Sequence, residues 1–228
     1  MKTAVIIPTY NESASIRILI EGVRIHKLDI IVIDDGSTDK TFQTAQECSV
    51  DIVRNECNLG KGASLIKGFT YALEKGYDAI LTMDGDGQHK PEDIPTFLSA
   101  AESSSCGIII GNRMSNVDNM PRLRIITNTF MSWVISRITK QPVPDTQCGF
   151  RLIKKEVLKK IKLRTRNFEI ESEMLIEASK AGFKIVSVPI KTVYNNERSH
   201  INPVRDTIRF FKYLIDRTKQ IKPRKWKK

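Results

Sequence analysis

Residues 81–89 read LTMDGDGQH and place acidic and amide side chains at alternating positions, directly after an apolar run. In an extended chain Asp84, Asp86 and Gln88 would project to the same side. The glycines between them allow the backbone to bend and a ligand to approach closely. Two carboxylates and an amide oxygen are hard ligands of the kind that Mg2+ and Mn2+ prefer. The motif therefore predicts a divalent-metal site, with a turn rich in Asp and Gly as the alternative.

Two further motifs place polar groups at the end of a predicted strand and at the start of a predicted helix. DDGSTD at 34–39 puts Asp34 and Asp35 at the end of a β-branched run, where a carboxylate could accept hydrogen bonds from a ribose or a base. Capping of the following helix is compatible with that role. NLGKGAS at 58–64 sets Lys61 between glycines at a predicted helix start, and such a place favours phosphate. The spacing is not that of a Walker A loop, and a solvated lysine is the alternative.

The hydrophobic pattern predicts the elements that position these motifs. Short apolar runs indicate strands, and apolar residues at helical spacing indicate helices. In the first half the pattern predicts strands over 3–7, 29–33, 51–54 and 78–83, and helices over 13–24, 38–48 and 61–75. This alternation implies a largely parallel sheet covered by helices. Because ligands bind at the carboxyl ends of such strands, the motifs should open onto one edge of the sheet.

The second half has a less regular pattern. It predicts strands over 107–111 and 184–188, helices over 124–139 and 171–181, and a last helix after Pro203. We expect one domain over 1–203 and a basic amphipathic extension over 204–228. The helix over 124–139 carries Phe130, Met131 and Trp133, which could dip toward lipid or belong to an ordinary core.

The net charge of +11 is concentrated at the end of the chain, because residues 198–228 carry +9 and residues 1–197 only +2. In 204–228, apolar residues at helical spacing are flanked by Lys and Arg, which predicts contact with an anionic membrane surface. A helix packed on the domain with a solvated tail is the alternative. The chain has no nucleic-acid-binding motif, so nucleic acid is not an expected partner.

Cysteine usage and hydropathy bear on the compartment. The four cysteines are widely spaced and form no Cys-x-x-Cys pair, which predicts reduced thiols rather than a zinc site or disulfide framework. No apolar run is long enough to span a bilayer, and the N-terminus lacks the pattern of a signal peptide. We therefore expect a cytoplasmic protein that associates peripherally with the cytoplasmic face of a membrane.

Taken together, the motifs carry a resemblance. VIIPTYNE, IVIDDGSTD, NLGKGAS and MDGDGQH, followed by GNR at 111–113 and DTQCGFR at 145–151, resemble the inverting family-2 glycosyltransferases over roughly residues 3–210. Within them, the chain is most similar to polyprenyl-phosphate sugar transferases of the dolichyl-phosphate mannose synthase type. The resemblance implies an α/β GT-A fold, which is a single Rossmann-like domain with a mostly parallel mixed sheet and helices on both faces.

The resemblance also implies an activity. A sugar would pass, with inversion, from a UDP- or GDP-linked donor to dolichyl or undecaprenyl phosphate, with Mg2+ or Mn2+ as cofactor. The alternative is a family-2 enzyme of cell-surface polysaccharide synthesis that acts on a saccharide hydroxyl, which would need a base such as Glu171 or Glu173. A lipid phosphate is already an anion and needs no base, but it must be bound and aligned by positive charge.

Roles for individual residues follow from the same resemblance. The predicted donor site contains Pro8, Tyr10, Glu12, Asp35, Lys61 and Asp84, and the predicted metal ligands are Asp84, Asp86 and Gln88. The predicted acceptor-phosphate site contains Arg113, Arg124, Arg198 and His200, with Arg205 close to the last two. Asp86, Arg113 and Arg151 are the residues that we expect to matter most for catalysis.

Overall fold

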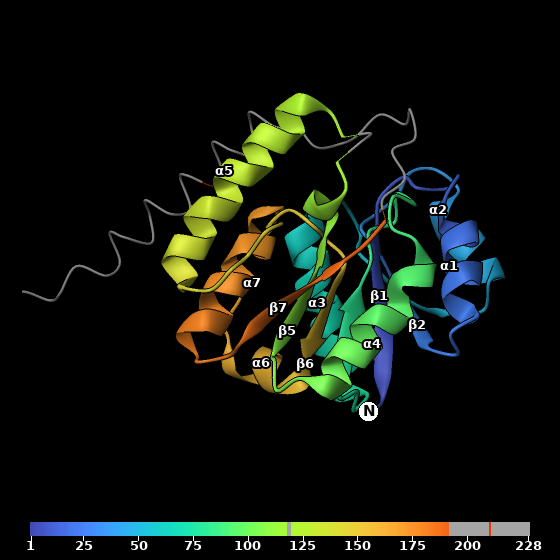
Figure 1. Ribbon diagram of the computed structural model, residues 1–228. Coiled ribbons are helices and arrows are strands. Elements are labelled where there is room, and N and C mark those ends of the chain that lie inside the picture. Colours follow the sequence, from blue (N-terminus) through green and yellow to red (C-terminus); the bar gives the residue numbers. More distant parts are fainter. Residues whose placement is uncertain (118–119, 192–209, 211–228) are drawn as a thin grey trace, which may run out of the picture.

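Seven strands form one mixed sheet in a computed structural model that describes residues 1–117, 120–191 and 210 (Figure 1). The strands are β1 (Thr3–Thr9), β2 (Asp29–Asp34), β3 (Asp51–Arg54), β4 (Ala79–Thr82), β5 (Ile108–Asn112), β6 (Arg151–Lys154) and β7 (Ile185–Pro189), in the spatial order β3-β2-β1-β4-β6-β5-β7. Strands β1 to β4 pair in parallel, as does β7 with β5, whereas β6 runs antiparallel to both β4 and β5. The mostly parallel mixed sheet is therefore confirmed.

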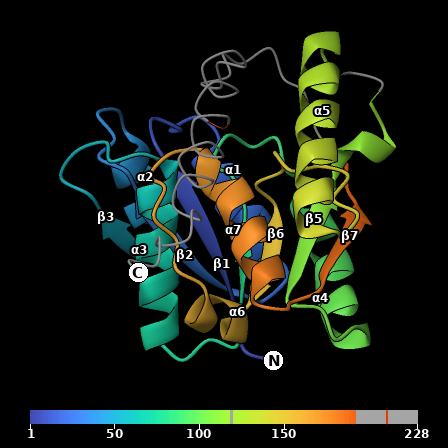
Figure 2. The same ribbon diagram turned by 90° about the vertical axis from the view of Figure 1, so that its left-hand side faces the viewer.

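Helices cover both faces of this sheet. They are α1 (Ile16–Arg24), α2 (Thr41–Glu47), α3 (Lys61–Glu74), α4 (Ile94–Ser103), α5 (Arg122–Thr139), α6 (Lys155–Lys160) and α7 (Glu169–Lys180), with single 3-10 turns η1 (Pro91–Asp93) and η2 (Arg113–Ser115). Figure 2 looks onto the face that carries α3, α6 and α7. Of the helices that the structure describes, none combines the length and the apolar character needed to cross a bilayer.

Strand β1 explains why both faces are buried. Ala4 and Ile6 pack toward α3, α5 and α7, whereas Val5 and Ile7 pack toward α1, α2 and α4, and all four are fully buried. Side chains alternate between the faces of a strand, so an unbroken apolar run is what a doubly covered sheet requires.

The carboxyl ends of β1, β2 and β4 lie at one edge, as predicted. The backbone N–H of Asp35 donates to the carbonyl of Thr9 at 2.9 Å, and that of Met83 donates to the carbonyl of Ile6 at 3.0 Å. These bonds join the three loops that follow the strands. The predicted meeting of the motifs at one edge is therefore confirmed for these loops.

Three elements were missing from the predicted pattern, namely α4, β6 and α6. Helix α4 follows η1 without a break, and Pro95 stands at its start, where proline is tolerated although it reads as a breaker. Strand β6 (RLIK) is four residues long and begins and ends with a charged residue, so it lacks a strand signature. The expected helix after Pro203 and the extension over 204–228 lie outside the described residues, apart from Phe210.

Candidate active site

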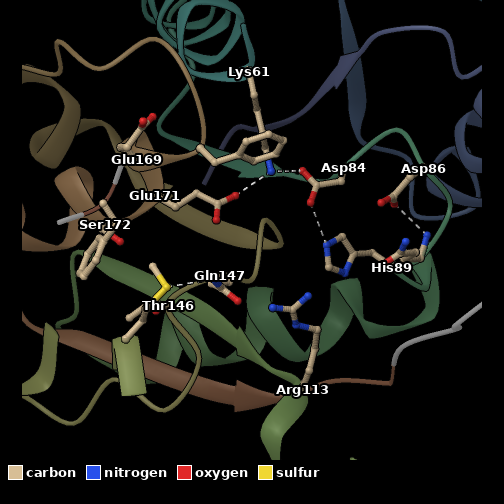
Figure 3. Close-up of a pocket in the computed structure, with 14 residues that line it drawn as sticks. Lys61, Asp84, Asp86, His89, Arg113, Thr146, Gln147, Glu169, Glu171 and Ser172 are labelled. Atoms are coloured by element: carbon tan, nitrogen blue, oxygen red, sulfur yellow. Dashed lines mark hydrogen bonds and ion pairs between the residues drawn. The ribbon is translucent and has the colours of Figure 1, made fainter. Parts of the chain in front are cut away.

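One pocket opens beside the turn that follows β4, and it collects the most specific sequence motifs (Figure 3). The predicted residues Lys61, Asp84, Asp86, Gln88 and Arg113 all line it. It is open to solvent on one side, so a ligand could enter it from outside. Residues from 146–147, α7 and the segment before α7 form its other walls. The pocket thus joins the two halves of the chain.

Lys61 lies between two carboxylates at the back of this pocket. Its Nζ is 2.6 Å from Asp84 Oδ1 and 2.6 Å from Glu171 Oε1, and its side chain is only 15% exposed. Burial alone would lower the pKa of Lys61, but the charges of Asp84 and Glu171 outweigh it and hold the pKa above its ordinary value. The ammonium therefore stays charged and is bound to carboxylates, which a solvated lysine would not be.

Asp84 is held on both of its oxygens. Lys61 contacts Oδ1, and His89 Nε2 lies 3.4 Å from Oδ2. Burial alone would raise the pKa of Asp84, but Lys61 and His89 outweigh it and hold the pKa well below its usual range. An ideal Cβ on Gly149 would lie 2.3 Å from Oδ2, so only glycine lets the carboxylate sit here. The Asp84 carboxylate is consequently ionised and closely fixed in position.

The motif after Asp84 is a turn, and it is not extended. The backbone N–H of Gln88 donates to Asp86 Oδ1 at 3.0 Å, which closes the turn, and Gly87 takes a positive φ of 70°. The alternative of a turn rich in Asp and Gly is therefore confirmed. Asp86 and Gln88 still line the same pocket as Asp84, and their binding of a metal stays a prediction. The glycines are what make the turn possible.

Asp84, Asp86 and Gln88 fit a divalent cation that takes only part of its ligands from the protein. Among the described residues, no group of three or more His, Cys, Asp or Glu side chains gathers in the manner of an all-protein metal cage. Asp84, Asp86 and the amide oxygen of Gln88 would supply a partial set of hard oxygen ligands. Mg2+ and Mn2+ accept such sets, because they keep water and phosphate oxygens as their remaining ligands.

Arg113 faces the carboxylate side across the pocket (Figure 3). Its Nε and Nη2 donate to the two oxygens of Asp145 at 2.7 and 2.9 Å, and Asn128 of α5 donates to the same carboxylate at 2.9 Å. Burial alone would raise the pKa of Asp145, but the Arg113 charge outweighs it and lowers the pKa. The guanidinium is thereby fixed in orientation at the pocket wall.

The structure does not bring Arg151 into the pocket. Its side chain is fully buried, and its guanidinium donates to the backbone carbonyls of Cys148, Glu171 and Thr146 at 2.6–2.7 Å. These bonds tie the pocket wall to the start of α7. Direct contact between Arg151 and an acceptor phosphate is therefore not supported, and the structure gives this residue a positioning role.

The other predicted residues lie elsewhere. Arg124 is in the first turn of α5 and does not line the pocket, and Arg198, His200 and Arg205 lie outside the described residues. Asp35 accepts hydrogen bonds from Asn55 and from the backbone of 59–60 at 2.8–3.0 Å, so its carboxylate fixes the loop before α3. Pro8 lies within β1 and not in a loop, whereas Tyr10 and Glu12 stand in the loop after this strand. Contact of the three residues with a nucleoside stays a prediction.

Several site residues were not singled out from the sequence. Asp145 and Gly149 both stand in DTQCGFR, so the signal was the motif itself, whose separate members could not be ranked. The pairing of Lys61 with Glu171 spans 110 positions, and only the fold reveals it. All four cysteines are free thiols, and burial raises the pKa of Cys148 to about 12.

Comparison with known proteins agrees with this geometry. The family model described as glycosyl transferase family 2 matches residues 4–162. A Methanococcus voltae protein named UDP-N-acetylglucosamine–dolichyl-phosphate N-acetylglucosaminyltransferase is 34% identical over 212 residues, which is 83% of this chain and 84% of that protein. The polyprenol monophosphomannose synthase of Mycolicibacterium smegmatis is 30% identical over 205 residues, covering 83% of this chain and 76% of the relative.

A solved structure with the same fold is glucosyl-3-phosphoglycerate synthase from Mycobacterium tuberculosis in complex with Mn2+, UDP-glucose and phosphoglyceric acid. It aligns with a TM-score of 0.74 over 95% of this chain and 79% of its own, at 18% sequence identity. At that identity the likeness establishes the fold alone.

Proposed function

The chain belongs to glycosyl transferase family 2, and we propose that it transfers a sugar from a UDP- or GDP-linked donor to polyprenyl phosphate, with a divalent cation and with inversion. As a member of this family it is a glycosyltransferase, and its fold is GT-A. One observation carries the finer proposal: the acidic turn 84–88 and the fixed guanidinium of Arg113 line the same pocket.

The donor half of the proposal rests on the acidic turn. Asp84, Asp86 and Gln88 would hold a divalent cation, which would neutralise the donor diphosphate and stabilise the departing nucleoside diphosphate. The related fold crystallised with Mn2+ and UDP-glucose supports a metal of this kind. The loops after β1 and β2, with Tyr10, Glu12 and Asp35, would hold the nucleoside.

The acceptor half rests on positive charge without a base. Arg113 would bind the lipid phosphate and align one of its oxygens with the anomeric carbon, opposite the leaving group. A phosphate anion attacks without losing a proton, so the reaction needs no general base. A single displacement of this kind inverts the configuration of the anomeric carbon.

The glutamates of α7 support a phosphate acceptor over a hydroxyl acceptor. Glu171 is bound to Lys61, and Glu173 accepts three hydrogen bonds from Arg164 and Thr165 at 2.7–3.0 Å. Each carboxylate is thus occupied by the protein. A general base must instead be within reach of the acceptor proton.

Peripheral membrane contact is part of the proposal, because polyprenyl phosphate resides in a bilayer. Helix α5 supports it, since its solvent face exposes a stripe of large apolar side chains, namely Leu123, Ile126, Phe130 and Trp133. Arg122, Arg137 and the C-cap residue Lys140 are exposed as well, and the Arg137 guanidinium lies 5.6 Å from the centre of the Trp133 ring. The opposite side of α5 lines the pocket through Met131. A helix with this pattern suits the interface of an anionic membrane, here its cytoplasmic face.

The test is a transfer assay on the full chain with short-chain polyprenyl phosphate in detergent and a panel of UDP- and GDP-sugars. We expect a lipid-linked sugar monophosphate, release of one nucleoside diphosphate, and loss of both products with EDTA. An α-linked product from an α-linked donor would exclude inversion. Transfer to a saccharide hydroxyl, with no lipid product, would establish the alternative acceptor.

A further inference from the structure

Asp84 already has a cation, and that cation belongs to the protein. The Lys61 ammonium contacts Oδ1 at 2.6 Å, which is the distance of a strong charge-assisted hydrogen bond. A divalent cation bound to the same oxygen would lie within a few Å of this ammonium. Two cations so close repel each other, and the partial burial of Lys61 and Asp84 strengthens that repulsion.

Of the two groups that contact Asp84, Lys61 is the one that can yield. His89 lies farther from the carboxylate, at 3.4 Å, and its buried ring packs against Phe150 with centroids 5.4 Å apart. Lys61 has a long side chain, which already contacts a second carboxylate, that of Glu171, at 2.6 Å. Losing Asp84 would therefore not leave the ammonium buried without a counter-ion, which would be costly.

The surroundings of Glu171 favour this transfer of the ammonium. The Phe168 ring lies 5.5 Å from Lys61 Nζ on the same side of the pocket, so it can stabilise the cation there. Arg151 fixes the start of α7 by donating to the Glu171 carbonyl at 2.6 Å. The second position of the ammonium is thus built into the protein before any ligand binds.

We propose that Lys61 is the resident counter-ion of Asp84, and that a divalent cation gains this carboxylate by displacing the Lys61 ammonium, which Glu171 then retains. This inference rests on the proposed metal dependence, and it adds that the two cations compete. The resident lysine keeps Asp84 neutralised when the pocket is empty. It also weakens binding of the metal, because the metal must displace the ammonium to reach the carboxylate.

The experiment measures Mn2+ affinity without nucleotide, from the EPR signal of unbound Mn2+ during titration of the full chain. Lys61→Met should raise the affinity at least about tenfold, because the competing charge is gone. Lys75→Met is the matched control, because Lys75 is the exposed C-cap residue at the other end of α3, so its loss should change the affinity little.

A charge-balanced variant separates competition from a general change in charge. Lys61→Met/Glu171→Gln removes one positive and one negative group and so leaves the net charge unchanged. It also removes the charge of Glu171, which would otherwise lose its lysine partner, and so serves if Lys61→Met fails to fold. The proposal expects this variant, too, to bind Mn2+ at least about tenfold more tightly than the wild type.

Three outcomes are distinguishable. Tighter binding by both Lys61 variants, with no effect of Lys75→Met, supports displacement. Unchanged or weaker binding by the Lys61 variants, with clear binding by the wild type, overturns the inference and leaves the metal site standing. Absence of Mn2+ binding in the wild type and in every variant, with or without UDP and GDP, overturns the metal site and the inference together.

Discussion

Arg113 and Asp145 form a bidentate pair in which both partners are buried, and the pair sets the wall of the pocket opposite the acidic turn. Their two side-chain hydrogen bonds measure 2.7 and 2.9 Å, and the Arg113 backbone N–H adds a third bond to the same carboxylate at 3.1 Å. Asn128 brings α5 into the same cluster. The helix that exposes an apolar stripe is thus coupled to the arginine proposed to bind the acceptor.

Breaking this pair should be costly. Asp145→Asn leaves a buried guanidinium without its counter-ion, and the loss of one partner of a buried pair costs about 3–5 kcal/mol. Urea unfolding at neutral pH should detect a change of this size. Asp78→Asn is the control, because its ion pair with Lys155 is partly exposed to solvent and its loss should cost much less. Equal losses in both variants would contradict a special role for the buried pair.

The same pair predicts how stability depends on pH. The folded-state pKa of Asp145 lies below its ordinary value of 3.8, because the Arg113 charge outweighs burial. A lowered pKa contributes stability that is complete above the unfolded pKa and is lost as pH falls through the folded pKa. The difference between wild type and Asp145→Asn in free energy of unfolding should stay constant from pH 7 to 5 and shrink below about pH 4. A difference that grows on acidification would contradict this.

A substitution at Gly149 tests how strongly activity depends on the position of the Asp84 carboxylate. In Gly149→Ala the new Cβ would meet Asp84 Oδ2 at 2.3 Å, so the carboxylate must move while Lys61 holds it. A displacement of about 1 Å at a reacting site can cost roughly 100-fold, and we expect such a loss in kcat/KM together with weaker Mn2+ binding. Gly76→Ala is the control: it strains a φ of 77° with open space around it and should lower stability without changing Mn2+ affinity.

The acidic turn gives a more direct prediction. Asp86→Asn removes one proposed metal ligand and should lower kcat at least about 100-fold, because a bound cation supplies several kcal/mol of transition-state stabilisation. The thermal midpoint should change little, since the only described partner of the Asp86 side chain is the Gln88 N–H at 3.0 Å. Full activity with a normal midpoint would remove Asp86 from the site.

Much of this site could be predicted from the sequence, because its signals are local. Asp84, Asp86 and Gln88 are separated by single glycines, and that spacing indicates both the turn and its chemistry. The meeting of the motifs at one edge of the sheet could also be predicted, because each apolar run ends at a polar motif. The pairing of Arg113 with Asp145 spans 32 positions, and nothing local distinguishes that aspartate from others nearby.

Arg151 shows where prediction from the sequence fails. It stands in a specific motif, and positive charge was needed at the acceptor, so a catalytic contact was the natural prediction. The fold instead places it beneath the pocket wall, where three backbone carbonyls occupy its guanidinium. A motif reports that a residue matters, whereas burial decides whether it touches a ligand or holds others in place.

The last prediction concerns the exposed stripe on α5. Trp133 is 56% exposed and Phe130 48%, and their rings stack with centroids 6.2 Å apart on the side of the helix away from the pocket. Burying a large apolar side chain contributes about 1.5–3 kcal/mol, so Phe130→Ser/Trp133→Ser should weaken binding to anionic vesicles at least about tenfold. Ile18→Ser is the matched control, because Ile18 is 76% exposed on α1, far along the chain from this stripe.

Vesicle sedimentation at two salt concentrations separates the electrostatic part of the binding from the apolar part. Flanking arginines and Lys140 should make binding stronger on anionic than on neutral vesicles, and added salt should reduce that excess while the apolar part of the binding persists. The double variant should lose mainly the salt-resistant part, with its circular dichroism and its activity on a short, detergent-soluble acceptor retained. If it binds vesicles as the wild type does, α5 is not the membrane contact. If it instead changes the sedimentation coefficient without vesicles, the stripe is an interface between two copies of the chain.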